Sequence, residues 1–158
     1  MESDKIIKKE PLIITSTEHL DELIGLLHDE HFNLNDIKHI KDQQVVEIPY
    51  RRMFHEGARR VIRNIFGIKR IEVELIRSLL IIRNVKDYEY DDRAQIGTYS
   101  FNTIKYNRNK LQIICCEDLE LNMVVSELKI ESRDVEVKGK TRITKGWFWD
   151  SYTGEVYE

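Results

Sequence analysis

The sequence contains little proline, glycine or cysteine: two, seven and two residues of 158. Flexible linkers are usually rich in glycine, serine or proline, so we expect order everywhere except at the termini. The chain also lacks an apolar run of about 20 residues, and its first ten residues contain no apolar segment typical of a signal peptide. These absences predict a cytoplasmic protein without a membrane partner.

The two cysteines, Cys115 and Cys116, are adjacent in a segment with strand-like alternation. Neighbouring side chains of a strand point to opposite faces, so these thiols are badly placed to form a disulfide or to share a metal ion. Unbridged thiols fit a reducing compartment. We expect one of the two to pack in the core, and we expect no cofactor.

The length allows one well-buried core and is short for two ordinary domains. We therefore expect a single domain over residues 1–158, with a flexible N-terminus at 1–10 and an aromatic C-terminal arm at 139–158. A formal net charge of −3 argues against bulk electrostatic binding to nucleic acid, although a local basic patch remains compatible with it.

One N-terminal amphipathic helix is predicted from capping residues and apolar spacing. Thr15 and Glu18 have the spacing of a capping box, and Ser16 and Thr17 are alternative caps. We expect the helix to end near His31. Its apolar stripe has the spacing i, i+3, i+4, i+7 and consists of Leu20, Leu23, Ile24 and Leu27.

From Ile37 onward the apolar period changes from 3.6 to 2. Pro49 has no N–H to donate, so the second of these strands is expected to end at a sheet edge. A stretch at 71–85 predicts two strands that break near Arg77 and Ser78. About eight strands without a repeating β–α rhythm predict an α+β fold with a mostly antiparallel sheet. The other strands are expected at residues 12–15, 37–40, 45–50, 99–106, 111–116, 119–125 and 128–137.

The segment 51–70 is the most distinctive part of the chain. It has seven cationic residues against one carboxylate, Glu56, a net charge of +6 in a chain whose total is −3. Apolar residues at 58, 61, 62, 65 and 66 have helical spacing, and Gly67 is well placed as a C-cap, so a short cationic helix between two strands is predicted. The cations are Arg51, Arg52, Arg59, Arg60, Arg63, Lys69 and Arg70.

Two interpretations of this segment remain open. In the first, the helix covers the sheet, and its arginines are solvated or paired with the acidic stretch 117–136. In the second, it binds an anionic partner, which would be RNA, a phosphate-bearing ligand or an acidic protein. Phe54 and Phe66 both fit a buried face, so the base stacking that would support nucleic-acid binding is weakly indicated.

His28, Asp29 and His31 form a candidate metal or catalytic cluster at the expected end of the helix. Histidines at i and i+3 can share a helix face and hold a divalent transition metal, but the spacing implies no third or fourth ligand. The alternative is structural, with His28 packing beneath the sheet and His31 at the helix C-terminus. No nucleotide-binding or nucleophile motif is present.

Five of the last twelve residues are aromatic, among them Trp147, Phe148 and Trp149. A disordered tail seldom has such a composition. The arm is expected either to dock on the domain as a final strand or to contact a partner, including a second copy of the chain.

Four stretches resemble a family of small uncharacterised prokaryotic proteins, which implies a single domain and no particular activity. The most probable function from sequence is a non-enzymatic binding module that presents residues 51–70 to an anionic or protein partner. The alternatives are a metal-dependent enzyme and a self-associating structural protein. The stretches are LLHDEHFNLNDIKHI, VVEIPYRR, LLIIRNVKDYEYDDRAQIGTYSFNTIKY and LELNMVVSELKIE.

Overall fold

The computed structural model describes residues 5–6, 10–53, 59–145 and 150–157. The chain divides into two compact units, each assembled from separate segments. The larger unit contains Lys9–Arg51 and Ser78–Asp134, and the smaller unit contains Met1–Lys8, Arg52–Arg77 and Val135–Glu158. Three strands have residues in both units. The single domain expected from the sequence stays a prediction.

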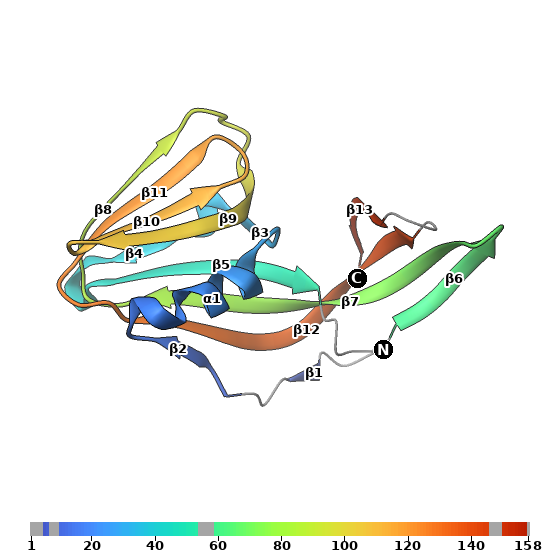
Figure 1. Ribbon diagram of the computed structural model, residues 1–158, viewed down its shortest axis with the longest axis horizontal. Coiled ribbons are helices and arrows are strands. Elements are labelled where there is room, and N and C mark those ends of the chain that lie inside the picture. The colour runs from blue at the N-terminus through green and yellow to red at the C-terminus, as the bar shows by residue number, and fades with distance from the viewer. Residues whose placement is uncertain (1–4, 7–9, 54–58, 146–149, 158) are drawn as a thin grey trace. The chain divides into compact units, whose positions relative to one another are not determined.

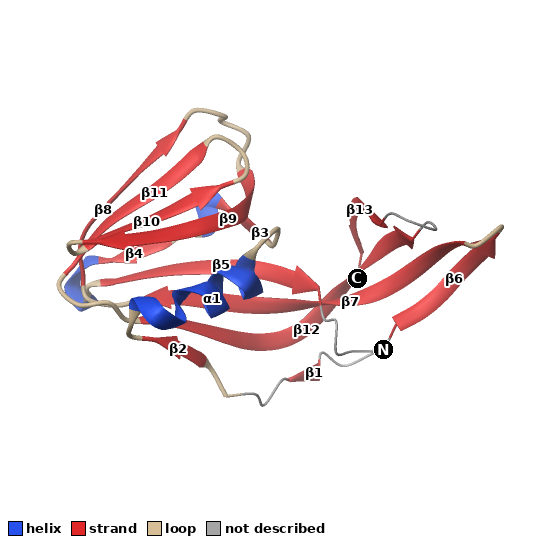
Figure 2. Cartoon of the chain, viewed as in Figure 1, coloured by secondary structure: helices blue, strands red, loops and turns tan. Residues whose placement is uncertain are grey.

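Strands dominate both units, and their pairings are antiparallel (Figures 1 and 2). The described residues contain one α-helix, which confirms the mostly antiparallel sheet with a single N-terminal helix. The strand order along the sheet is β1-β12-β7-β5-β3-β9-β10-β11-β8, with β2, β4, β6 and β13 attached. The strands are β1 Lys5–Ile6, β2 Leu12–Ile14, β3 His31–Asn33, β4 Lys38–Ile40, β5 Val45–Met53, β6 Arg59–Ile65, β7 Ile68–Ile82, β8 Val85–Asp92, β9 Thr98–Asn107, β10 Lys110–Cys115, β11 Leu119–Val125, β12 Ile130–Lys145 and β13 Asp150–Tyr157.

Among the residues that the structure describes, the sheet has thirteen strands rather than about eight. Strands of two or three residues, such as β1 and β3, are too short to show an alternating pattern. The sequence also divides β7 wrongly near Arg77 and Ser78, where the structure has one continuous strand. Ser78 is buried within it because its hydroxyl donates a hydrogen bond of 2.8 Å to Asp134 Oδ1.

The helix α1 spans Leu20–Leu27 and follows a 3₁₀ turn at Thr17–His19. The Ser16 side chain caps that turn by accepting a hydrogen bond from the Glu18 amide, as one of the alternative caps predicted. The helix ends four residues before His31, because His28 is extended (φ −54°, ψ 127°) and Asp29 has a φ of 65°. The chain then enters β3.

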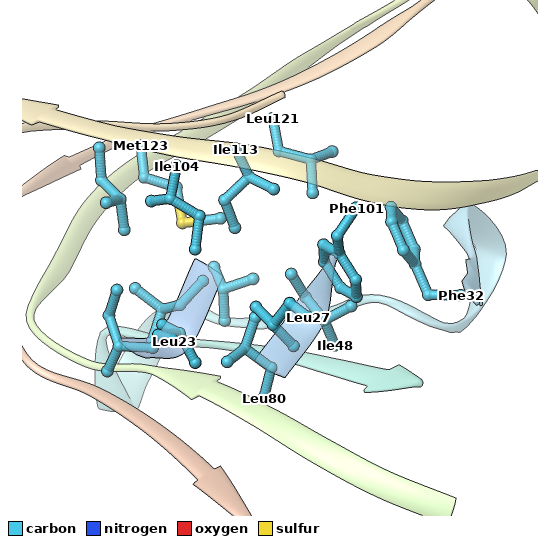
Figure 3. Packing of buried hydrophobic residues seen from close by; sticks show 14 of the residues in the cluster. Leu23, Leu27, Phe32, Ile48, Leu80, Phe101, Ile104, Ile113, Leu121 and Met123 are labelled. Carbon is cyan, nitrogen blue, oxygen red and sulfur yellow. The ribbon is translucent and has the colours of Figure 1, made fainter. Parts of the chain in front are cut away.

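The core of the larger unit is formed by two layers of strands together with the buried side chains of α1. Figure 3 shows Leu23 and Leu27 of α1 between Ile113 of β10 and Leu80 of β7. Cys115 is buried and Cys116 is exposed, which confirms that one thiol packs in the core. Burial is the main cause that raises the pKa of Cys115 to about 12, and nearby acidic groups raise it further. This thiol therefore stays protonated at neutral pH.

Pro49 shows how a proline fits inside a paired strand. β5 lies between β7 and shorter partners, with β4 opposite Val45 to Glu47 and β3 opposite Tyr50 and Arg51. Pro49 falls in the gap between these two short partners. The predicted edge is therefore a local gap and not an edge of the whole sheet.

Candidate functional site

The described residues 59–70 of the basic segment form a β-hairpin with the strand that follows them. β6 pairs with the start of β7 in antiparallel register. Ile65 lies opposite Ile68 beside the turn, and Arg59 lies opposite Val73 at the far end. The two-residue turn consists of Phe66 and Gly67. Phe66 has φ 53° and Gly67 has φ 78°, and two positive φ values in succession are typical of a type I′ hairpin turn. The cationic helix predicted from the sequence is therefore wrong for residues 59–67.

The hairpin exposes apolar side chains around its turn. Phe66 is 89% exposed, Val61 54%, and Ile65 and Ile68 43% each. Their exposure also corrects the prediction that Phe66 belongs to a buried face. A cluster of exposed apolar side chains in a charged protein typically marks a contact surface.

The arginines proposed from the sequence do not share one surface. Arg51 is exposed in the larger unit, where it lies opposite His31 of β3. Arg52 is 4% exposed, and its guanidinium donates a hydrogen bond of 3.4 Å to the Met53 carbonyl. Arg52 therefore contributes to internal packing, and Arg51 is the exposed one of these two arginines.

The register of the hairpin places two cations directly opposite each other. Arg63 pairs with Arg70, while Arg60 pairs with Glu72 one step beyond a β-bulge. Like charges opposite each other in an antiparallel pair are destabilising, by a fraction of about 1 kcal/mol. Arg59 lies opposite Val73 and Lys69 opposite Asn64.

Carboxylates of the acidic stretch 117–136 pair with arginines outside the basic segment. Glu131 accepts hydrogen bonds from Arg83 and Arg133, at 3.2 and 3.0 Å. Glu136 forms an ion pair with Arg77. The sequence predicted that the acidic stretch could pair with the arginines of residues 51–70. Two of its carboxylates, Glu131 and Glu136, form ion pairs with other arginines instead.

The predicted metal cluster is split between three local structures. His28 lies just beyond α1, where its Nδ1 is 3.2 Å from the Asn102 carbonyl oxygen and its Nε2 is 3.6 Å from Asp29 Oδ2. His31 is on β3 and does not share a helix face with His28. Within the described part of the chain no three His, Cys, Asp or Glu side chains are arranged to hold a metal ion. Metal binding here stays a prediction.

His31 belongs to a polar row that the sequence does not reveal. It lies opposite Ser100 of β9, and the Glu117 carboxylate accepts hydrogen bonds from the Ser100 amide (2.7 Å) and hydroxyl (2.8 Å). Burial opposes ionisation of Glu117, but the two bonds from Ser100, together with His31, outweigh it and lower its pKa. No spacing in the sequence connects these three residues.

Removing the Ser100 hydroxyl is expected to raise the pKa of Glu117, because one of the two hydrogen bonds that favour the carboxylate is lost. The measurement is an NMR pH titration of the Glu117 side-chain carboxyl in Ser100→Ala and in the parent protein. Ser126→Ala, at an exposed position, is the matched control. An unchanged or lower pKa in Ser100→Ala would contradict the hydrogen-bond explanation.

Trp147, Phe148 and Trp149 lie outside the described residues, so their role in partner binding stays a prediction. On either side of them, β12 and β13 pair, with Lys145 opposite Asp150 and Lys140 opposite Tyr157. The described backbone before these three residues therefore pairs, as antiparallel strands, with the described backbone after them.

Comparisons with protein families, with curated proteins and with solved structures find no match to this chain. In the described residues no helix has both the length and the apolar character needed to cross a membrane.

Proposed function

We propose that the protein is a non-enzymatic interaction module that contacts an acidic protein surface through the β6–β7 hairpin. The observation that carries the proposal is the exposed apolar tip, Phe66 with Ile65 and Ile68, next to the cations of both strands. Exposed aromatic and aliphatic side chains supply contact area, and cations supply orientation and attraction to an acidic surface.

The charge distribution supports an acidic partner. The smaller unit, which contains the hairpin, has thirteen cationic residues against nine acidic ones, a net charge of +4. The larger unit has twelve against nineteen, a net charge of −7. Such a separation raises the rate at which the basic unit meets an acidic surface. The free thiols of Cys115 and Cys116 support a cytoplasmic location for this encounter.

Single-stranded nucleic acid is the second candidate partner, because Phe66 is exposed among cations. Proteins that bind single strands combine a basic surface with aromatic side chains on which bases stack. One such aromatic is described here, so this candidate has less support than an acidic protein surface.

Charge reversal on the hairpin is expected to abolish binding to an acidic polypeptide. The probe is fluorescein-labelled poly-L-glutamate, and the measurement is fluorescence anisotropy at low salt. The variant Arg60→Glu/Arg63→Glu/Lys69→Glu removes three cations and adds three carboxylates, so we expect affinity to fall at least about tenfold. Phe66→Ser keeps the charge and should weaken binding less.

The matched control is Lys105→Glu/Lys110→Glu/Arg108→Glu, which makes the same charge change at exposed positions in the larger unit. This control changes the net charge by the same amount but leaves the hairpin intact. We therefore expect its affinity to fall less than that of the hairpin variant, by the effect of net charge alone. Equal losses in both variants, or no binding by the parent protein, would overturn the proposal. Stronger binding to a single-stranded DNA oligonucleotide than to poly-L-glutamate would favour the second candidate.

A further inference from the structure

Six strands of the described chain pair with a single described neighbour and so have an open edge: β1, β2, β4, β6, β8 and β13. β6 pairs with β7 and with no other described strand, and β8 ends the strand order, paired only with β11. An edge strand presents backbone N–H and C=O groups that can pair with an added strand. Three of these strands are longer than three residues: β6 has seven residues, and β8 and β13 have eight each. Among these three, β6 and β8 have the largest net charges, +3 and −3, against −2 for β13.

β6 and β8 have opposite charge. β6 contains three arginines and no carboxylate, and β8 contains four carboxylates against the single cation Lys86. Like charges on facing strands disfavour β6 with β6 and β8 with β8, since each pairing brings one sign of charge together. The same charges favour β6 with β8.

The accessible part of β8 is its second half. Near its start, the Tyr88 ring contacts His39 with ring centres 5.6 Å apart, and the Tyr88 amide donates to Asp87 Oδ1 at 3.0 Å. Glu89 and Asp91 are exposed, and Tyr90 is 54% exposed. An added strand would therefore enter alongside Glu89 to Asp92, where Glu89 and the Tyr90 ring are exposed and Asp91, also exposed, forms an ion pair with Arg93 of the same copy.

We propose that a second copy of this chain is the acidic partner, with β6 of one copy adding as a strand to the open edge of β8 in another. The proposal rests on the function proposed above and names its partner. Backbone hydrogen bonds between the strands provide affinity, and the Arg–carboxylate pairs select β6 against β8. Because the two contact surfaces differ, the contact is heterologous, and it closes as a reciprocal pair or continues as a chain of copies.

The test is a charge swap followed by sedimentation velocity. In one variant β8 is reversed (Asp87→Lys/Glu89→Lys/Asp91→Lys), and in the other β6 is reversed (Arg59→Glu/Arg60→Glu/Arg63→Glu). The parent protein should associate at about 50 mM salt and dissociate at about 500 mM, where charges are screened within a few ångströms. Each variant alone should be a monomer, because its two edges then have the same sign of charge. An equimolar mixture should associate again.

Circular dichroism first establishes that each variant folds, and amide hydrogen exchange of the parent protein supplies a measurement that needs no variant. Amides of β8 should exchange more slowly at high protein concentration than at low concentration. A parent protein that stays monomeric at low salt, or a mixture of folded variants that does not associate, overturns the proposal. If the monomeric parent still binds poly-L-glutamate through the hairpin, the proposed function stands. If association is unchanged by reversal of β6 and poly-L-glutamate binding is unchanged by reversal of the hairpin, both fail.

Discussion

Phe101→Ala is expected to lower the free energy of unfolding by about 3–5 kcal/mol, because it leaves a cavity in a closely packed core. Phe101 is 2% exposed, and its ring centre is 4.6 Å from that of Phe32 and 5.6 Å from that of Tyr50. These three rings join β9, β3 and β5 in the middle of the larger unit. Truncation of Phe101 removes contacts from all three strands at once.

Urea unfolding followed by circular dichroism measures this effect, under high salt so that association does not contribute. The control is Val124→Ala on β11, where a 41% exposed side chain faces solvent and a loss below about 1 kcal/mol is expected. A loss for Phe101→Ala that is no larger than for the control would mean that the ring is not an essential part of the core. The slope of unfolding free energy against urea should be the same in both variants.

The sequence predicts well those elements whose determinants are local. The helix is recognised because the Ser16 cap and the stripe from Leu20 to Leu27 lie within twelve consecutive residues. The β9–β10 hairpin is recognised because the two strands alternate and join at Arg108–Asn109, where positive φ values suit a short polar turn. No distant contact is needed for either prediction.

Residues 59–67 were predicted wrongly because their apolar residues have helical spacing that the structure does not use. Val61 and Ile65 lie in a strand that is interrupted by a bulge between Val61 and Arg63, and Phe66 lies in the turn. The decisive fact is pairing with β7, whose Ile68 and Ile71 lie opposite Ile65 and Val61. A long paired strand provides hydrogen bonds and cross-strand contacts that outweigh helix propensity over a few residues.

The polar row around Glu117 could not be predicted for a different reason. Ser100 and Glu117 are 17 residues apart in the sequence, and Ser100 is on β9 whereas Glu117 follows β10. The antiparallel pairing of β9 and β10 places Cys115 opposite Phe101, and the Cys116 amide donates a hydrogen bond to the Ser100 carbonyl, so that the next residue, Glu117, lies near Ser100. Isolated serines and glutamates have no spacing rule that identifies such a pair, so its recognition requires the fold.

Arg83→Met/Arg133→Met is expected to destabilise the protein by about 3–5 kcal/mol at neutral pH, since it leaves the Glu131 carboxylate buried without its charged partners. Glu131 is 7% exposed and accepts a hydrogen bond from each arginine. Burial alone would raise the pKa of Glu131, but the two arginines outweigh burial and lower it. The double substitution removes the two arginines that lower the pKa of Glu131 and leaves the burial that raises it.

The sign of the pH dependence then reverses. In the parent protein the folded pKa of Glu131 lies below the unfolded value, so its stabilising contribution is complete above the unfolded pKa, about 4.3, and is lost as pH falls through the folded pKa. In the double variant burial holds the folded pKa above the unfolded value. Its destabilising contribution is therefore complete at neutral pH and disappears as pH falls through that raised pKa. The stability difference between the two proteins should narrow steadily from pH 7 towards pH 4.

Adding Glu131→Gln to the double variant separates charge from packing. The neutral amide has nearly the same shape, so it should recover much of the lost stability at pH 7 and abolish the additional pH dependence. Arg93→Met is the matched control, because its partner Asp91 is exposed and such surface pairs contribute about 0–1 kcal/mol. If Glu131→Gln brings no recovery, the arginines stabilise the larger unit through the packing of their side chains and not through the buried carboxylate.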